Sequence, residues 1–388
     1  MTQPPPPTGP PLPHSGIRPG EQAHQPWTPP PGWIPTPQGW IPPQPVHVPR
    51  RFRPPLTAGP LPFHRLFRGL AGFAWWRPLV AIGVGFAAYL VISVLFTLVL
   101  VGIGVAAGEI DLGVTAQDAN DALVELTQID AASPLSLLLA LGSVALLLPS
   151  AIIGQLAAGL RPLGVRHSVA FRVRWRWFFV SLIPAFATVG AAFLIPVAVS
   201  LAFGEVPFGP MTTDPALFAL CAAIILVITP LQSAAEEYVF RGLLAQSIGS
   251  WLRFAPVGWI ITTIVFVSGH VYDVWGLLSV GAFGFGAAVI VSRTGGLEAG
   301  IALHSVNNIA SFLVLASGVQ GTTVNPTSGS TDLGVNLVSI AIALLTTAAW
   351  VLWVDRWAKR RALATLGGML PPTAHNSVAP EPAAGAAS

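Results

Sequence analysis

Two acids and an arginine stand in one of the most apolar stretches of this chain, as Glu236-Glu237-Tyr-Val-Phe-Arg241. A charged side chain at the centre of a bilayer costs about 2.5–3.5 kcal/mol even on the mildest scale, so such residues persist where they serve a purpose. On a helix, Glu237 and Arg241 are four residues apart with the acid first, which favours an ion pair. Glu236 points about 100° away from Glu237. The pattern therefore predicts one acid held by arginine beside a second acid that could act as a general base.

Two more polar groups follow on separate apolar segments. Phe266-Val-Ser-Gly-His270 ends one segment, and His304-Ser-Val-Asn-Asn308 lies on another. His304 and Asn308 are four residues apart and share a helix face, an arrangement that suits two donors aimed at one point. Each group taken alone also has a purely structural interpretation. The two acids could simply pair with other helices, and a single histidine in a membrane more often hydrogen-bonds a neighbouring helix.

The motifs of several other enzyme classes are absent from the sequence. The sequence contains no His-Glu-x-x-His, no Gly-x-Ser-x-Gly and no glycine-rich phosphate loop. Ser268 and Ser305 lie one or two residues from histidines, and such neighbours do not face each other on a helix, which disfavours a serine nucleophile. Tyr272 and Asp273 are interpreted as a plain turn. Glu298 opens a helix, where an acid complements the dipole.

Taken together, Glu-Glu-x-x-x-Arg at 236–241, Phe-x-x-x-His at 266–270 and His-x-x-x-Asn at 304–308 are specific. This ordered set resembles the CPBP (CAAX prenyl protease and bacteriocin-processing, or Abi) family of intramembrane proteases. The resemblance covers residues 215–320 and extends, through the arrangement of spans, over 78–354. It implies that Glu236, helped by His270, activates a water for attack on a peptide carbonyl. It also implies that His304 and Asn308 stabilise the oxyanion.

The same resemblance implies that Glu237 and Arg241 hold the helix and tune the field at Glu236. The family has also been described as metal-dependent, so Glu236, His270 and His304 are the expected ligands of a divalent metal such as zinc, with one position left for water. The sequence does not separate this arrangement from a water activated by glutamate alone.

The composition places these residues inside a membrane. The chain is 53% hydrophobic and 9% charged, with a mean hydropathy of +0.68. We expect an all-α polytopic membrane protein of about eight transmembrane helices around a polar catalytic cavity. The expected spans, of which the fifth is short, are 78–106, 134–160, 178–203, 215–233, 256–271, 274–292, 297–318 and 335–354.

Charge distribution predicts the orientation of these spans. Arginines precede the first span, fill 161–177 and follow the last span, whereas 107–133, 204–214 and 319–334 hold no basic residue. Basic connections stay in the cytoplasm, so we expect a multi-pass protein of the plasma membrane with both termini cytoplasmic. The basic clusters are interpreted as orientation signals or as contacts with anionic lipid, and no nucleic-acid partner is expected.

Simple hydropathy predicts different membrane depths for the three groups that should form one site. It places Glu236 at the inner end of the fourth span and His270 near the outer end of the fifth, while His304 lies ~10 Å inside the seventh. The three groups converge only if the fourth helix runs deeper, or if the fifth is tilted or offset towards the inner face. Water must also reach them, so the cavity is expected to open to the cytoplasm and sideways to lipid.

Four regions follow along the chain. Residues 1–62 hold most of the 38 prolines and a near-repeat, Gly32-Trp-Ile-Pro35 and Gly39-Trp-Ile-Pro42, which predicts a disordered tail that could dock a proline-binding partner. Residues 63–77 form a basic and aromatic juxtamembrane segment. The membrane domain covers 78–354, and 355–388 is a basic exit with a disordered tail.

Three functions fit this organisation. The preferred one is an endopeptidase that cuts a membrane-associated or lipid-modified peptide. The second is a non-catalytic immunity or scaffold protein of the same fold, against which intact Glu236, His270 and His304 argue. The third is a proton-coupled transporter, but the two halves show no convincing internal repeat.

Overall fold

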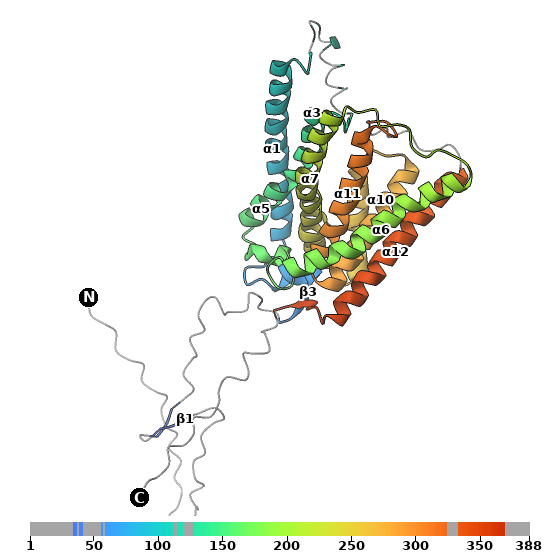
Figure 1. Cartoon of the computed structure of the whole chain (residues 1–388). Helices are drawn as coiled ribbons and strands as arrows, with labels where there is room; N and C mark the ends of the chain where they lie inside the picture. Colours follow the sequence, from blue (N-terminus) through green and yellow to red (C-terminus); the bar gives the residue numbers. More distant parts are fainter. Residues whose placement is uncertain are drawn as a thin grey trace, which may run out of the picture. The chain divides into compact units, whose positions relative to one another are not determined.

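The computed structural model describes residues 56, 59–111, 113, 115, 117, 118, 121, 124, 128–323 and 333–368, and the backbone of 34–36 and 39–41. The chain divides into two compact units, Met1–Arg53 and Pro54–Ser388. The second unit is a bundle of helices (Figure 1). Its described helices are α1 (Arg77–Ala107), α3 (Pro134–Leu137), η3 (Leu138–Gly142), α4 (Ser143–Ala145), α5 (Leu147–Ala157), α6 (Trp175–Ala202), α7 (Pro215–Glu237), η5 (Tyr238–Leu244), α8 (Ala245–Trp251), α9 (Ala255–Ser268), α10 (Val274–Thr294), α11 (Glu298–Ser317) and α12 (Leu333–Arg360).

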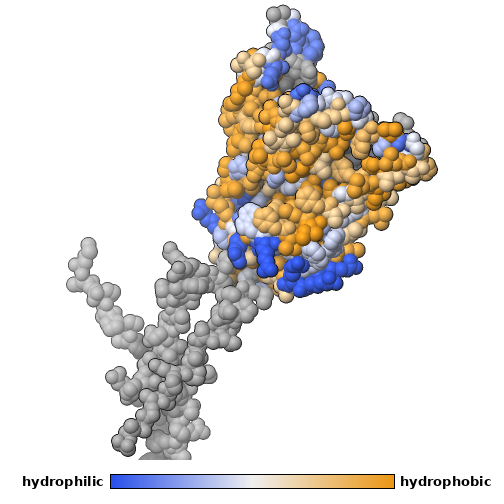
Figure 2. Space-filling model, viewed as in Figure 1, coloured by the Kyte–Doolittle hydropathy of each residue, from blue (hydrophilic) through white to orange (hydrophobic). Residues whose placement is uncertain are grey.

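The prediction of an all-α polytopic membrane protein is confirmed. In the described part of the chain, seven helical stretches are long and apolar enough to cross a membrane, and α9 is a shorter apolar helix. Figure 2 shows an apolar surface over the middle of the bundle on the side in view, with hydrophilic residues gathered at its two ends. α1 and α12 are the least covered by other helices, as Leu98 and Leu345 illustrate with 63% and 69% exposure. Both therefore face lipid.

The fourth span runs deeper than its hydropathy predicts. α7 continues without interruption through the π-helical η5 and into α8, so the helical stretch Pro215–Trp251 is 37 residues long. The predicted boundary at residue 233 was wrong because the charged residues that lower its hydropathy lie inside the helix and not at its end. Asp214 begins this helix by accepting hydrogen bonds from the backbone of Ala216 and Leu217.

The two flanks of the bundle lie on the same side. Strand β3 (Leu61–Pro62) pairs antiparallel with β4 (Leu366–Gly367), so the chain enters α1 and leaves α12 at one face. The loop between α5 and α6 reaches the same face, since the Val169 amide donates to Gly295 and the Arg174 guanidinium to Ala364. We call this end of the bundle the basic face. The chain therefore crosses the bundle an even number of times.

Short helices and capping residues tie this face together. η2 (Phe63–Gly69) packs against α8, where the Trp251 indole donates to the backbone of Trp75. η4 (Leu163–Arg166) packs against η5. At the other end, Asp273 caps α10 by accepting from the Gly276 amide, which agrees with its interpretation as a turn residue.

In the first unit, β1 (Ile34–Thr36) pairs antiparallel with β2 (Gly39–Ile41), with Pro35 opposite Trp40. The near-repeat therefore forms a hairpin with itself at positions where the sequence predicts no paired structure. The other residues of 1–53 and residues 369–388, for which the sequence predicts disordered tails, lie outside the described residues. The docking of a proline-binding partner by the N-terminal tail stays a prediction.

Candidate functional site

The predicted ion pair between Glu237 and Arg241 is present and fully buried. Arg241 Nη1 lies 3.1 Å from Glu237 Oε1, and the two side chains are 1% and 0% exposed. A second nitrogen of the guanidinium, Nη2, donates to the backbone oxygen of Gly284 on α10 at 2.8 Å. The ring of Phe266 on α9 covers the guanidinium at 4.5 Å. Arg241 thus joins three helices through one charge.

Gly284 is required for this approach. A Cβ atom at this position would lie 3.0 Å from Phe266 Cδ1 and 3.1 Å from Arg241 Nη2. The small side chain therefore allows the guanidinium to reach the helix backbone. The run of small residues around 281–288 indicated close packing in the sequence, but it did not identify the partner.

His304 lies between the two glutamates. Its Nδ1 is 3.1 Å from Glu237 Oε1, and its Nε2 is 3.1 Å from Glu236 Oε2. Since a neutral imidazole has one N–H, both contacts can be donated hydrogen bonds only when the ring is protonated. The aromatic rings of Phe266 and Phe283 pack edge-on against the imidazole at 6.0 and 5.1 Å. His304 is thus oriented by contacts at both of its nitrogens and by two aromatic rings.

Glu236 is the accessible member of the pair. Its side chain is 11% exposed, whereas that of Glu237 is 0% exposed. Glu237 already accepts from Arg241 and His304 through Oε1. Glu236 makes its one ion-pair contact with His304, so it keeps carboxylate capacity for a further donor. This separation of the two acids agrees with the prediction from helix geometry.

Asn308 continues the site along α11. It donates through Nδ2 to Gln232 Oε1 at 3.2 Å, and its Oδ1 accepts from Asn307 at 3.1 Å. Gln232 lies four residues before Glu236 and is 5% exposed. The sequence analysis missed Gln232, although its position one helical turn from Glu236 was a signal. Asn308 has a second amide hydrogen, so this contact does not exhaust it.

His270 reaches the same depth as the other groups. Its ring stacks at a tilt on Phe266 with the centroids 4.7 Å apart, and the same Phe266 ring packs edge-on against His304 with the centroids 6.0 Å apart. The tension in the predicted depths is thereby resolved: the fourth helix extends to Trp251, and the short α9 starts beyond it, offset towards the basic face. His270 Nδ1 contacts the backbone oxygen of Phe266 at 2.9 Å. It makes no hydrogen bond to Glu236 in this structure.

Tyr272 adds a side chain that the sequence analysis assigned to a plain turn. Its ring stacks on His270 with the centroids 6.0 Å apart and an angle of 27° between the planes. Burial and the negative charge of Glu236 raise the pKa of the Tyr272 phenol, which therefore stays protonated at neutral pH. The chain between α9 and α10 thus places Tyr272 within electrostatic range of Glu236.

The donor set does not form a metal site in this arrangement. The described residues contain no group of three or more His, Cys, Asp or Glu side chains placed to hold a metal ion. Both nitrogens of His304 face carboxylates, so neither is directed at a shared point with His270. The assignment of Glu236, His270 and His304 as ligands therefore stays a prediction, and no step below is built on a metal.

Comparison with known proteins identifies the segment that carries the site. Residues 215–310 match the family model of the type II CAAX prenyl endopeptidase Rce1-like proteins. YyaK of Bacillus subtilis (strain 168), an uncharacterized protein, is 30% identical over 146 residues, which cover 33% of this chain and 48% of YyaK. The chain thus spans about half the length of this relative. No solved structure matches.

The family match includes all three motifs, at 236–241, 266–270 and 304–308. It confirms the resemblance to CAAX-type proteases that these motifs predicted and gives this segment a fold of that type.

Proposed function

We propose that this protein is an intramembrane endopeptidase in which Glu236 activates a water molecule. The observation that carries the proposal is the unequal use of the two glutamates. Glu237 is committed to Arg241 and His304, whereas Glu236 contacts His304 alone and remains accessible. A carboxylate with spare acceptor capacity in an apolar surrounding is suited to general-base catalysis.

In the proposed reaction, the water oxygen attacks the carbonyl carbon of the scissile peptide bond while its proton passes to Glu236. The carbonyl oxygen becomes an oxyanion, for which the second amide hydrogen of Asn308 is a candidate donor. His304 is the other candidate, and it can donate only if its Nε2–H turns away from Glu236 after that carboxylate has taken the proton. When the tetrahedral intermediate collapses, the C–N bond breaks and Glu236 returns the proton to the leaving amine. Glu237 positions His304 through Nδ1.

His270 and Tyr272 are assigned to the mouth of this site. They stack on each other, and Phe266 contacts both His270 and His304. Because His270 uses Nδ1 for the Phe266 backbone, its Nε2 is the atom available to orient a water or substrate near Glu236. A contact between His270 and Glu236 is absent in the present arrangement.

The substrate is proposed to be a membrane-associated or lipid-modified peptide. Two features support this class: the site lies inside an apolar bundle, and the family model that matches residues 215–310 describes prenyl endopeptidases. His304 lies six residues into α11 from the basic face, or ~9 Å. If the basic face is cytoplasmic, as its arginines predict, the peptide enters from the cytoplasmic leaflet of the plasma membrane.

The test is cleavage of a farnesylated CAAX reporter peptide and a panel of membrane peptides by the purified full-length protein. Wild type is compared with Glu236→Ala and with Glu205→Ala, which removes an exposed acid from the loop before α7. We expect cleavage by wild type and Glu205→Ala and a loss of at least about a hundredfold in Glu236→Ala. Equal rates in all three proteins would contradict the proposal.

A strong chelator added to the wild-type reaction distinguishes the two origins of the nucleophile. The present arrangement, in which both nitrogens of His304 face carboxylates, favours water activated by Glu236 without a metal. We therefore expect the rate to be unchanged. Loss of activity with the chelator and its return with zinc would replace this step by a metal-bound water held by Glu236, His270 and His304.

A further inference from the structure

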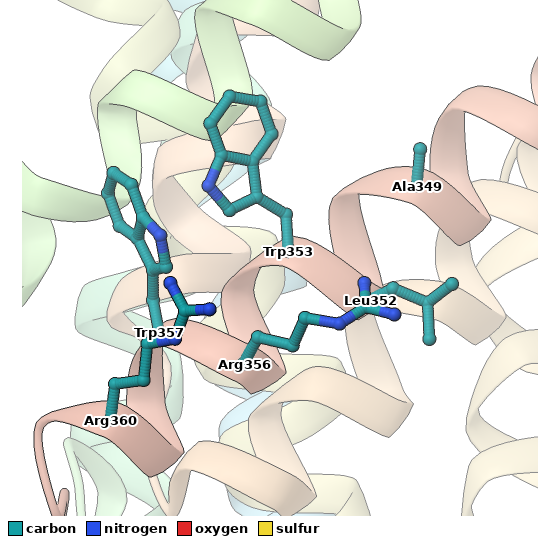
Figure 3. Close-up of a pocket in the computed structure, with 6 residues that line it drawn as sticks. All are labelled: Ala349, Leu352, Trp353, Arg356, Trp357 and Arg360. Atoms are coloured by element: carbon teal, nitrogen blue, oxygen red, sulfur yellow. The ribbon is translucent and has the colours of Figure 1, made fainter.

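A hollow lies on the outer surface of α12, near the basic face and on a helix that carries none of the motifs. It has a volume of about 450 Å³. The residues that line it lie on one side of the helix and are Ala349, Leu352, Trp353, Arg356, Trp357 and Arg360. Figure 3 shows the two indole rings on the same side of α12, with the Arg360 side chain beside Trp357 and Arg356 extending along the helix towards Leu352.

The two arginines of the hollow have no acidic partner in the described part of the chain. Asp355 is next to Arg356 in the sequence, but its carboxylate is already paired with Lys359 at 2.6 Å and with Arg293 at 3.3 Å. Arg356 and Arg360 are four residues apart and exposed, so they present two guanidinium groups one turn apart. Both guanidinium groups are therefore able to contact the same anionic group.

The rest of the hollow is apolar and continues along the helix towards the membrane interior. Trp353 and Trp357 pack edge to face with their rings 5.6 Å apart. Leu352 is 51% exposed and Leu345, about two turns earlier on the same side, is 69% exposed. Tryptophan is favoured at the level of lipid headgroups. Charge and apolar surface thus follow each other along α12 in the order found in a phospholipid, headgroup first and acyl chains next.

We propose that this hollow binds an anionic phospholipid from the leaflet at the basic face. The phosphate accepts hydrogen bonds from Arg356 and Arg360, and the indole N–H groups are further donors within the hollow. The acyl chains lie along Leu352 and Leu345. α12 packs against α10, whose Phe283 contacts His304, but the binding itself is independent of any proteolytic activity.

The test is a titration of the full-length protein, purified in a neutral detergent, with short-chain fluorescent phosphatidylglycerol or phosphatidylcholine. Fluorescence anisotropy gives the dissociation constant. Each basic residue near an anionic lipid contributes a factor of roughly five, so we expect Arg356→Ala/Arg360→Ala to weaken phosphatidylglycerol binding about 30-fold. Phosphatidylcholine binding should change less than about threefold, because its headgroup has no net charge.

Two controls make the result specific. Arg172→Ala/Arg176→Ala removes the same charge from exposed positions of the basic face outside the hollow, and we expect it to change phosphatidylglycerol binding less than about threefold. Arg356→Lys/Arg360→Lys keeps the charge and is expected to retain the preference for phosphatidylglycerol over phosphatidylcholine. An equal loss in both alanine variants, or equal binding of the two lipids by wild type, would overturn the proposal.

Discussion

Two clusters of buried acids and bases in this protein differ in how completely their charges are matched. At the basic face, Glu298 begins α11 and pairs with Arg174 alone. Its Oε1 accepts from the amide of Arg174 at 2.9 Å and from Nε at 2.8 Å, and its Oε2 accepts from Nη2 at 2.7 Å. Arg174 Nη1 donates to the backbone oxygen of Thr294. One acid and one base satisfy each other and fix a loop to a helix.

In the interior cluster, two acids share one arginine and one histidine. Arg241 and His304 both turn towards Glu237, and only His304 also reaches Glu236. The interior cluster therefore keeps one carboxylate beyond what the permanent cation can neutralise. The comparison indicates that burial of charge alone does not identify a reactive group in a membrane protein. In the proposed function, the incomplete pairing at Glu236 distinguishes the reactive carboxylate, and the following variants test this distinction.

The largest effect is expected from Glu236→Gln. The amide keeps the shape of the side chain but cannot accept a proton, so turnover should fall by about 10²–10⁴. Stability should change by less than about 1.5 kcal/mol, because the glutamine Oε1 can still accept a hydrogen bond from His304 Nε2. Stability can be followed without introducing a cysteine by mutation, since Cys221 is the only cysteine of the sequence and is 0% exposed. Its labelling by a maleimide dye during heating reports unfolding.

Glu237→Ala should have the next largest effect, which we expect mainly on the stability of the fold. It leaves Arg241 and His304 buried without their shared acceptor. Breaking a buried pair by removing one partner costs about 3–5 kcal/mol. Thiol labelling of Cys221 should therefore begin at a markedly lower temperature than in wild type. A melting curve that matches that of Glu236→Gln would refute the difference in roles between the two acids.

Arg174→Ala should destabilise the protein by about 1–3 kcal/mol, because it leaves buried Glu298 without its donor. This cluster has no proposed contact with substrate. Turnover per folded molecule should therefore equal that of wild type at a temperature where both are folded. Measuring the cleavage rate and the folded fraction on the same sample checks this outcome, and a specific loss of turnover would remove the contrast between the two clusters.

Gly284→Ala should cost about 1–2 kcal/mol through crowding of Phe266 and Arg241. Gly281→Ala is the matched control, since a Cβ there would meet Val267 Cγ2 at an ordinary 3.6 Å. Its helix position should tolerate or slightly favour alanine. Comparing the two melting temperatures by Cys221 labelling separates the tight contact around Arg241 from the general effect of an added methyl group.

The smallest effect is a pH dependence at the basic face. Burial, and then the nearby Arg166, lower the pKa of His167, while Glu298 opposes them, and the ring contacts the Tyr238 hydroxyl. A lowered pKa means that the unfolded state binds the proton more readily. The contribution of His167 is therefore present above the unfolded value of about 6.5 and is lost as the pH falls towards the folded value.

Melting temperatures of wild type and His167→Gln between pH 7.5 and 5.5 test this sign. The wild type should lose more stability on acidification than the variant. Burial lowers the pKa of His64 as well, so the informative quantity is the difference between the two proteins and not the slope of either. A larger acid loss in His167→Gln would contradict the assignment.

The sequence predicts those parts of the site that lie within one helix. The four-residue spacing of Glu237 and Arg241 predicts their ion pair, and the 100° offset predicts that Glu236 stays outside it. Both expectations are confirmed. The all-α membrane fold also follows from composition and from the apolar runs, because a bilayer leaves a chain few alternatives to the helix.

Contacts between helices could not be predicted in the same way. The contact of Glu237 with His304 joins residues that are 67 positions apart, and no local spacing encodes it. The depth of His270 relative to Glu236 depends on the extension of the fourth helix to Trp251. Hydropathy does not predict this extension, because charged and polar residues lie within that part of the helix. The sequence analysis did not assign Gln232 or Tyr272 to the site. Each residue taken alone has an ordinary structural role, and only its position relative to Glu236 connects it with the site.

The most direct test of the account compares Glu236→Gln with Glu298→Gln in single-turnover cleavage of the same reporter peptide, at equal folded fractions set by Cys221 labelling. The account predicts that Glu236→Gln loses about 10²–10⁴ in rate with little change in melting temperature. It predicts that Glu298→Gln melts earlier and cleaves at the wild-type rate while folded. Rates that fall in both variants in proportion to their loss of stability would contradict the claim that Glu236 is the carboxylate that activates the water.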